Sequence, residues 1–338
     1  MRQHNQIGDM LCSLTLYKAL KKKHPDARIT LVAAKTNYEI PFFDINPFID
    51  RVIVFDKSSL LKIILFIKSL RSLRYDLGIV PSTIVLSRTS HIINWLSGAK
   101  KRVGVKSIDD KTNESQKYLN IKSDFIWKNI HQRQRNLQVV KQIGCDLSES
   151  EINSINFTFS ENEERFAKEF ISNHFPDKEK KIIAFHPGAG KDANRWDKNN
   201  FIDLIKTLYG RYQNYVLLTS GWTDNPIVGS VSDTLKKLSI PFVILHNAPI
   251  KKLASVLSAV DLYITNDTGT MHIAGYSGAR MISIFGPTDP KEWAPGGINQ
   301  KFIKSPDGNI NSIPVEQVYS MACNMFEKKQ SSEIILCG

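Results

Sequence analysis

The sequence has few cysteines and no long apolar run. Its four cysteines, in 338 residues, show no metal-ligand spacing, so we expect reduced thiols. No apolar run approaches the roughly 20 residues that span a bilayer, and the stretch 60–70 is interrupted by Lys62 and Lys68. That stretch is typical of an amphipathic helix. The first residues do not resemble a signal peptide, and we therefore expect a cytoplasmic protein.

Metal ligands are also scarce. No Asp-x-Asp occurs, so the carboxylate pair that commonly holds a divalent cation is absent from the sequence. The isolated histidines are expected on the surface or in loops rather than at a metal; they are His24, His91, His131 and His174. The sequence therefore predicts no metal site.

Acidic residues are outnumbered, and the net charge is +12. This balance favours polyanionic partners, namely nucleic acid, an anionic membrane surface or a phosphorylated substrate. The basic residues form separate short runs at 21–23, 100–102 and 251–252, without the interleaved aromatics of a nucleic-acid surface. We therefore expect no nucleic-acid partner, and an anionic membrane surface is the better candidate.

Helical patterns alternate with short apolar runs along both halves of the chain, which predicts parallel sheets with crossover helices. We expect helices at 9–23 and 124–144. The boundary between two Rossmann-like domains is placed in the polar stretch after residue 145, giving domains 1–160 and 161–338. Strands are expected at 28–33, 51–55, 77–81, 102–105, 181–185, 215–219, 242–245, 262–265 and 281–285.

The first expected element is a loop that leads directly into Gly8 and Asp9. A parallel sheet of this kind normally begins with an apolar strand before such a loop, but residues 2–6 are all polar. The first strand is therefore expected to be missing, or the start of the chain to lie further upstream. Asp9 itself is interpreted either as a helix N-cap or as a general base.

The polar turn 266–270 is the strongest motif. It follows an apolar strand and precedes a helix, where free backbone N–H groups and the helix dipole favour phosphate. Asp267 and His272 flank it with groups that can bind sugar hydroxyls. A capped helix start would explain Asp267 or Thr268, but not the whole cluster with Gly269 and Thr270. The motif therefore predicts a nucleotide-sugar site.

Two further loops follow apolar runs. Gly188, Ala189 and Gly190 form a glycine-rich loop that is suited to a diphosphate, and Asn194 and Arg195 follow it. Residues 188–193 also spell the dinucleotide pattern G-x-G-x-x-A, but the next turn stays polar instead of opening a helix at once. The loop 220–224 is either an ordinary connection or part of a nucleoside pocket.

Together these motifs resemble the heptosyltransferase-like family of bacterial glycosyltransferases, glycosyltransferase family 9. The resemblance runs nearly end to end, through 7–9, 131–144, 186–196, 266–272 and 285–288. It implies an α/β fold of the GT-B type, with two parallel-sheet domains facing a cleft. The acceptor would bind the first domain and the donor the second. It also implies inverting transfer that needs neither a metal nor a cofactor.

The resemblance assigns a role to each motif residue. Asp9 matches the base that deprotonates the acceptor, and Asp267 matches the carboxylate that binds the donor sugar. Thr268, Gly269 and Thr270 match the amides that bind the diphosphate in the family. His272 stands at the position of the family's histidine. The implied co-substrate is a nucleoside-diphosphate sugar such as ADP-heptose, and the implied acceptor is lipopolysaccharide core or a related glycan, reached at the inner face of the membrane.

Two positions depart from the family pattern. Asn194 stands where the family commonly has Lys, so Arg195 or Lys191 would have to supply that charge. Thr223 aligns with an acidic residue near the ribose, although Asp224 is adjacent. Two other classes of function therefore stay open, a catalytically impaired nucleotide-sugar-binding protein and an NAD-dependent oxidoreductase.

Overall fold

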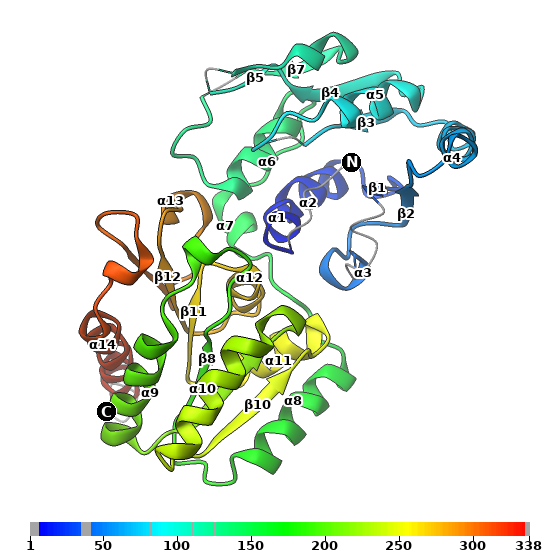
Figure 1. Ribbon diagram of the computed structural model, residues 1–338. Coiled ribbons are helices and arrows are strands. Elements are labelled where there is room, and N and C mark those ends of the chain that lie inside the picture. Colours follow the sequence, from blue (N-terminus) through cyan, green and yellow to red (C-terminus); the bar gives the residue numbers. More distant parts are fainter. Residues whose placement is uncertain (1–6, 35–41, 82, 110, 125, 335–338) are drawn as a thin grey trace. The chain divides into compact units, whose positions relative to one another are not determined.

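The computed structural model describes residues 7–34, 42–81, 83–109, 111–124 and 126–334 (Figure 1). The chain divides into two compact units, Met1–Ile155 and Asn156–Gly338, called unit 1 and unit 2 below. The expectation of a missing first strand concerns residues 1–6, which lie outside the described ranges. No helix within those ranges combines the length and the apolar character needed to cross a bilayer.

Unit 1 consists of short strands, most of them parallel, and their connecting helices. The longest of these helices, α4, is capped at its N-terminus by Ser59. The Ser59 side chain accepts a hydrogen bond from the Lys62 backbone N–H, as expected for an N-cap. In chain order the elements are α1 (Ile7–Cys12), α2 (Leu14–Lys23), β1 (Thr30–Ala34), α3 (Phe42–Ile45), β2 (Arg51–Phe55), α4 (Leu60–Ser72), β3 (Leu77–Ile79), α5 (Arg88–Leu96), β4 (Lys101–Val105), β5 (Ser107–Ile108), β6 (Lys111–Thr112), η2 (Glu114–Tyr118), β7 (Ile121–Ser123), α6 (Gln132–Lys141) and α7 (Glu149–Asn153).

The parallel strands of unit 1 fall into two separate sheets, β1–β2 and β3–β4–β7. Within the described residues, the only partner of β1 is β2, and the only partner of β3 is β4. A cavity of about 1370 Å³ is lined by Thr30 and Val32 of β1 and by Leu77 and Ile79 of β3. Residues of α2, α4 and α5 complete its walls. In the part of the chain that the structure describes, the two sheets thus line a common, partly open cavity.

Unit 2 is a doubly wound α/β domain. Its six parallel strands have the order β10-β9-β8-β11-β12-β13. The elements are α8 (Glu161–His174), β8 (Ile182–His186), η3 (Asp192–Asn194), α9 (Lys198–Tyr212), β9 (Tyr215–Ser220), η4 (Trp222–Asp224), α10 (Asn225–Lys237), β10 (Phe242–His246), α11 (Ile250–Ala259), β11 (Leu262–Asn266), α12 (Gly269–Tyr276), β12 (Met281–Phe285), α13 (Pro290–Trp293), β13 (Gln300–Lys304), η5 (Ile310–Ser312) and α14 (Val315–Ile334).

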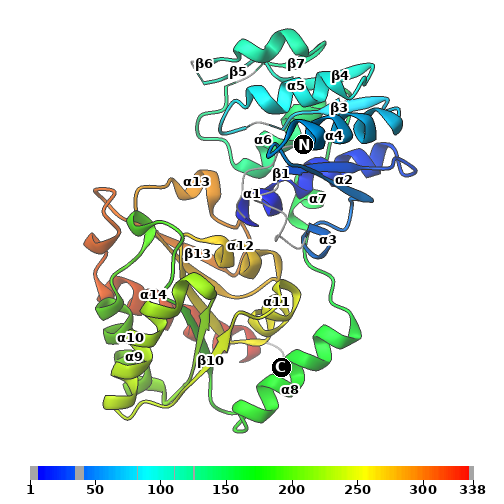
Figure 2. The same cartoon turned by 45° about the vertical axis from the view of Figure 1, so that its right-hand side comes forward.

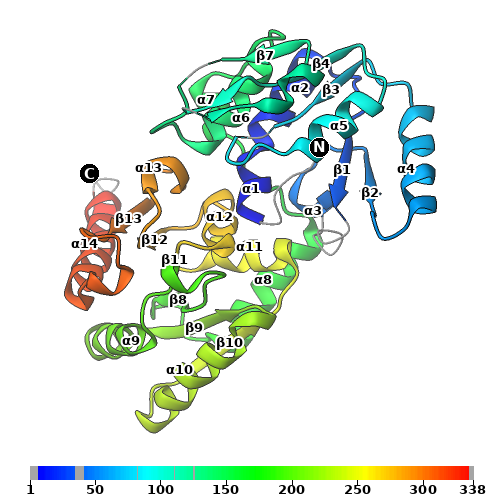
Figure 3. The ribbon, with the colours of Figure 1, turned by 45° about the horizontal axis from the view of Figure 1, so that its top comes forward.

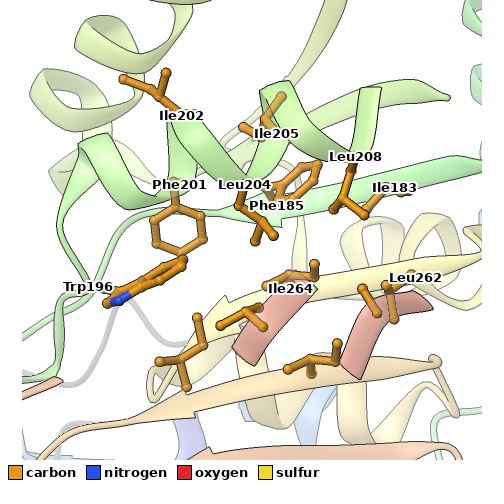
Figure 4. Packing of buried hydrophobic residues seen from close by; sticks show 14 of the residues in the cluster. Ile183, Phe185, Trp196, Phe201, Ile202, Leu204, Ile205, Leu208, Leu262 and Ile264 are labelled. Carbon is orange, nitrogen blue, oxygen red and sulfur yellow. The ribbon is translucent and has the colours of Figure 1, made fainter. Parts of the chain in front are cut away.

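Helices cover both faces of this sheet. Helices α9, α10 and α14 pack together on one face, whereas α8, α11 and α12 pack on the other (Figures 2 and 3). The first layer buries a large apolar core in which Phe201, Leu204 and Leu208 of α9 meet Phe185 of β8 and Ile264 of β11 (Figure 4). Strands that are covered on both faces read as continuous apolar runs, which is why sequence patterns identified them.

The expected helices at 9–23 and 124–144 differ from the observed ones. The first is interrupted at Ser13, whose Oγ donates to the Met10 carbonyl oxygen at 2.7 Å, so α1 and α2 are separate helices. The second begins only at Gln132, because Asn129 adopts a left-handed conformation, with φ of 62°, and His131 is the N-cap. Strand β13 was not expected at all.

The expectation for His91 was also wrong, because its ring is buried on α5. Its Nδ1 donates to the Ser87 carbonyl oxygen at 2.7 Å, and its Nε2 accepts from Asn113 Nδ2 at 3.0 Å. Burial lowers the pKa of His91 below its ordinary value. His91 is therefore a hydrogen-bonded core residue.

Candidate functional site

The sequence motifs of unit 2 meet at one edge of its sheet. Strands β8, β9, β11 and β12 are parallel, so the loops that follow them lie at the same edge. We call these loops, residues 187–190, 221–224, 267–270 and 286–289, the strand-end cluster. Chain order reverses between neighbouring strands β8 and β11, and in doubly wound sheets ligands bind at such a switch point.

Asn266, the last residue of β11, connects its own strand with the loop that follows β8 and with the segment that precedes α9. Its side chain is fully buried. Its Nδ2 donates to the carbonyl oxygens of Pro187 and Gly188, at 3.1 and 3.0 Å, while its Oδ1 accepts from the Trp196 backbone N–H at 3.1 Å. One amide thus fixes the glycine-rich loop and the segment that leads into α9. The sequence placed Asn266 in the motif but did not identify this role.

Asp267 and Asn194 are hydrogen-bonded to each other. Asn194 Nδ2 donates to the Asp267 carboxylate at 3.0 Å and to its carbonyl oxygen at 3.3 Å. Burial raises the pKa of Asp267, while a hydrogen bond from Thr288 and the charges of Lys191 and Lys304 act in the opposite direction. Asn194 therefore orients the carboxylate without neutralising it.

Asp224 faces the glycine-rich loop. Its carboxylate accepts from the Gly221 backbone N–H at 2.8 Å and lies 3.6 Å from His186 Nε2. A Cβ on Gly188 would come within 2.1 Å of an Asp224 oxygen, so a larger residue at this position would displace the Asp224 carboxylate. His186 Nδ1 donates to the Thr219 carbonyl oxygen at 3.0 Å, and burial lowers the pKa of His186. In the sequence this acidic residue was noted as part of the loop 220–224 and as the neighbour of Thr223, but it was not named as a site residue.

Arg195 is hydrogen-bonded to the backbone of the glycine-rich loop. Its guanidinium donates to the Ala189 carbonyl oxygen at 3.1 Å and forms an ion pair with Asp192 at 2.8 Å. The adjacent Trp196 is fully buried, and its Nε1 donates to the Ile313 carbonyl oxygen at 3.0 Å. Arg195 therefore has contacts within its own loop. Helix α9 begins only at Lys198, so the residues after Gly190 do not open a helix at once.

The first turn of α12 carries the strongest sequence motif. Thr268 is the N-cap, with φ of −152° and ψ of 173°, but its side chain makes no capping hydrogen bond. Gly269 and Thr270 form the first turn, and His272 is buried there with its ring 6.2 Å from that of Trp293. Thr268 thus does not satisfy the helix start with its own side chain. The helix dipole and N–H groups at this end suit an anion.

Lys304 is a site residue that the sequence motifs did not reveal. It ends the edge strand β13, and its Nζ donates to the Gly286 carbonyl oxygen in the strand-end cluster. Its charge also acts on Asp267. The signal that could have found it is a Lys at the end of a strand, but only two of the five residues 300–304 are apolar, and no strand was expected there.

Two predicted site residues are placed differently from the rest. Asp9 lies in unit 1, half-buried on the first turn of α1, and its catalytic role stays a prediction. Thr223 lies on η4 with an exposed side chain, whereas the adjacent Asp224 contacts the cluster. In the ranges that the structure describes, no three His, Cys, Asp or Glu side chains gather so that they could hold a metal ion.

Comparisons with known proteins agree with this arrangement. The model of the family described as glycosyltransferase family 9 (heptosyltransferase) matches residues 63–319. A lipooligosaccharide heptosyltransferase 2 of Campylobacter jejuni is 30% identical over 118 residues, which cover 34% of this chain and 37% of that protein. The chain thus spans little more than a third of this relative's length.

Two further matches extend over most of the chain. A lipopolysaccharide heptosyltransferase 3 of Escherichia coli is 25% identical over 88% of this chain and 85% of its own length. The solved structure of the E. coli ADP-heptose lipopolysaccharide heptosyltransferase II has a TM-score of 0.76 and 20% identity, and the match covers 97% of this chain and 98% of that one. The α/β fold is therefore of the GT-B type.

Proposed function

We propose, since the chain belongs to glycosyltransferase family 9, that it transfers a sugar from a nucleoside-diphosphate sugar to a glycan acceptor. The donor is ADP-heptose and the acceptor is lipopolysaccharide core or a related glycan, as the names of its relatives suggest. Transfer inverts the anomeric centre and uses no metal ion. The nucleotide sugar is a co-substrate, and the enzyme has no other cofactor.

One observation carries the donor part of this proposal. The uncapped start of α12 adjoins the switch point between β8 and β11, where Lys304 adds a positive charge. Backbone N–H groups, a helix dipole and an ammonium group together suit a diphosphate. The Asp267 carboxylate, held by Asn194, suits the hydroxyls of the donor sugar.

The same groups explain how the diphosphate could leave without the help of a metal ion. As the bond between the anomeric carbon and the diphosphate oxygen breaks, negative charge develops on the diphosphate. Fixed N–H donors and the ammonium group of Lys304 stabilise that charge without a cation from solution. Lys191 also lies near enough to act on Asp267, so a second ammonium group is available where Asn194 replaces the family's Lys.

Acceptor activation is assigned to Asp9. Its carboxylate takes the proton of the acceptor hydroxyl, and the hydroxyl oxygen attacks the anomeric carbon from the side opposite the diphosphate. A bond from that carbon to the acceptor oxygen forms as the bond to the diphosphate breaks, and the configuration inverts. A general base of this kind contributes about 10²- to 10⁴-fold to a rate.

Such an enzyme works in the cytoplasm, and its acceptor is anchored in the inner membrane. The net charge of +12 favours peripheral contact with anionic lipids and with a phosphorylated core acceptor. No nucleic-acid partner is proposed.

Calorimetry and product analysis test this function with the purified chain. ADP-heptose should bind more tightly than other nucleotide sugars or NADH, and Asp267→Asn should weaken that binding. With core glycan from a heptose-deficient strain, the wild type should form a product of inverted configuration. Asp9→Asn should keep donor binding while turnover falls at least about 10²-fold.

The other outcomes identify the rival functions. Donor binding without turnover on any acceptor, unchanged by Asp9→Asn, would indicate a nucleotide-sugar-binding protein. Tight binding of NADH with no binding of ADP-sugars would indicate an oxidoreductase that uses the loop 188–190. Either result would overturn the proposed transfer.

A further inference from the structure

Helix α4 exposes an unusual amount of apolar surface. Leu60, Leu61, Ile64 and Leu65 are 73, 65, 53 and 55% exposed. Positions i, i+1, i+4 and i+5 of a helix share one face, so the four side chains form a single patch. Scattered exposed apolar residues are ordinary, but a contiguous patch marks an interaction site.

The opposite face of α4 explains why the helix folds without this patch. Phe66 and Leu70 are buried in a cluster with Val32 of β1 and Ile93 of α5. The helix packs against β2 and α5 through that face. Figure 3 shows α4 running beside β2 within unit 1. The exposed leucines and isoleucine are thus not required by the core of the unit.

The charges around the patch have one sign. Helix α4 contains no acidic residue. Exposed Lys68 and Arg71 lie one turn or more beyond the patch, and exposed Lys57 lies just before the helix. The neighbouring Asp56 forms an ion pair with Lys62 at 2.9 Å, so its charge is balanced locally. An aliphatic patch with flanking cations therefore lies on one short helix.

We propose that α4 is a membrane-docking helix, which lies in the interface of an anionic bilayer with Leu60, Leu61, Ile64 and Leu65 among the acyl chains. Interfacial helices combine a strongly apolar face with Lys and Arg that reach phosphate headgroups. Lysine is depleted at protein–protein interfaces, and aromatic residues, which are enriched there, are absent from this face of α4. Its composition therefore favours a lipid surface over a second copy of the chain.

This inference deepens the proposed function, because an enzyme docked through α4 would meet a lipid-anchored acceptor at the membrane surface. Docking would raise the local concentration of the acceptor around the enzyme. It would not change the proposed donor site, which lies in unit 2. Loss of docking should therefore raise the KM for a membrane-embedded acceptor and leave the affinity for the soluble donor unchanged.

Vesicle co-sedimentation tests the proposal with the full chain. Vesicles of phosphatidylglycerol mixed with phosphatidylcholine should bind the wild type, and vesicles of phosphatidylcholine alone should bind it weakly. The triple variant Leu61→Gln/Ile64→Gln/Leu65→Gln keeps good helix formers at these positions and should reduce binding to the anionic vesicles at least about tenfold. The double variant Lys68→Gln/Arg71→Gln should weaken binding roughly fivefold for each charge and flatten its salt dependence.

A matched control removes equally exposed apolar side chains elsewhere. Ile126→Gln/Ile298→Gln should bind anionic vesicles like the wild type, since both residues lie outside α4. Circular dichroism of every variant should match the wild type, because none of the changed residues is buried. If the triple variant and the control bind alike, α4 is not the docking surface.

Two outcomes would overturn the proposal in different ways. A wild-type chain that sediments as a dimer, and a triple variant that sediments as a monomer, would assign the patch to a second copy. A wild type that ignores anionic vesicles would exclude a lipid surface. Neither result bears on donor binding, so failure of the docking proposal is distinguishable from failure of the proposed transfer, which calorimetry with ADP-heptose tests separately.

Discussion

Replacement of Asn266 by alanine should damage stability and donor binding together. The buried side chain holds the carbonyl oxygens of Pro187 and Gly188 and the backbone N–H of Trp196. These three groups belong to the loop that follows β8 and to the segment before α9. Alanine removes all three hydrogen bonds and leaves each partner facing a small gap in the core.

The expected loss of folding free energy follows from the number of buried polar groups that lose their hydrogen-bond partner. A buried polar group that loses its partner is destabilised by about 1–3 kcal/mol, so three groups give an upper range near 9 kcal/mol. A water molecule in the gap would satisfy part of the set, because it is surrounded by two acceptors and one donor. We therefore expect a loss of about 3–5 kcal/mol, a large share of the roughly 5–15 kcal/mol that keeps a domain folded.

Urea unfolding and calorimetry measure the two consequences. Asn266→Ala should shift the unfolding midpoint of unit 2, and any folded variant should bind a nucleoside diphosphate at least about tenfold more weakly, since the glycine-rich loop is no longer fixed. Asn266→Asp keeps one acceptor for Trp196 but loses both donors, so it should be at least as unstable. The control Asn199→Ala, at an exposed position of α9, should change stability by less than about 0.5 kcal/mol.

The reasoning fails if Asn266→Ala loses less than about 1 kcal/mol, the value expected for one ordinary hydrogen bond. A different result would separate the two roles. If stability falls as expected but donor affinity is unchanged, Asn266 supports the core without aligning the loop for a ligand, and the site must lie elsewhere on the sheet.

Three further predictions rest on other contacts. Gly188→Ala should reduce stability by about 1–3 kcal/mol in urea unfolding, because its methyl group displaces the Asp224 carboxylate from its backbone donor; unchanged stability would contradict the contact. Lys304→Met should weaken nucleoside-diphosphate binding about tenfold or more in calorimetry, whereas Lys301→Met, at an exposed position near the start of the same strand, should not, and equal effects would argue against a phosphate contact. Burial lowers the pKa of His186, so the unfolded state binds the extra proton, and its contribution to stability should be lost as pH falls below about 6.5; unfolding free energies measured against pH for the wild type and His186→Gln should differ in that window.

Much of the strand-end cluster could be predicted from the sequence. The central strands of unit 2 are buried on both faces, so short and mostly apolar runs stand out against the polar turns after them. Parallel topology then brings those turns to one edge. The motif 266–270 was thus assigned to a strand end and a helix start, and the structure places it there.

Side-chain direction within the turns could not be predicted. Thr223 and Asp224 are neighbours in a short 3₁₀ turn, and only the fold decides that Asp224 faces Gly188. The bond from Asn194 to Asp267 joins residues that are far apart in the chain. The sequence shows an Asn where the family commonly has Lys, but it does not show that this Asn orients the sugar-binding carboxylate.

Lys304 escaped prediction for a different reason. An edge strand is covered less completely than a central one, so its sequence alternates and carries charges. Strand β13 has a single well-buried residue, Ile303, between exposed or half-exposed neighbours. Its apolar signal was too weak to indicate a strand, and the cation at its end was therefore not counted among the candidate donor-binding residues.

The described strands of the two units are joined differently, and that difference bears on how each unit is held together. In unit 2 the central strand β8 pairs with β9 on one edge and β11 on the other, so one ladder joins all six strands. Among the residues of unit 1 that the structure describes, β1 and β3 are not paired, and residues of both strands line the cavity. The β1 residues Leu31 and Ala33 are nevertheless buried, because α2, α4 and α5 cover the strands around that space. Within its described residues, unit 1 thus depends on helix packing where unit 2 has a continuous ladder of backbone hydrogen bonds, and a region held in this way opens locally at lower free energy.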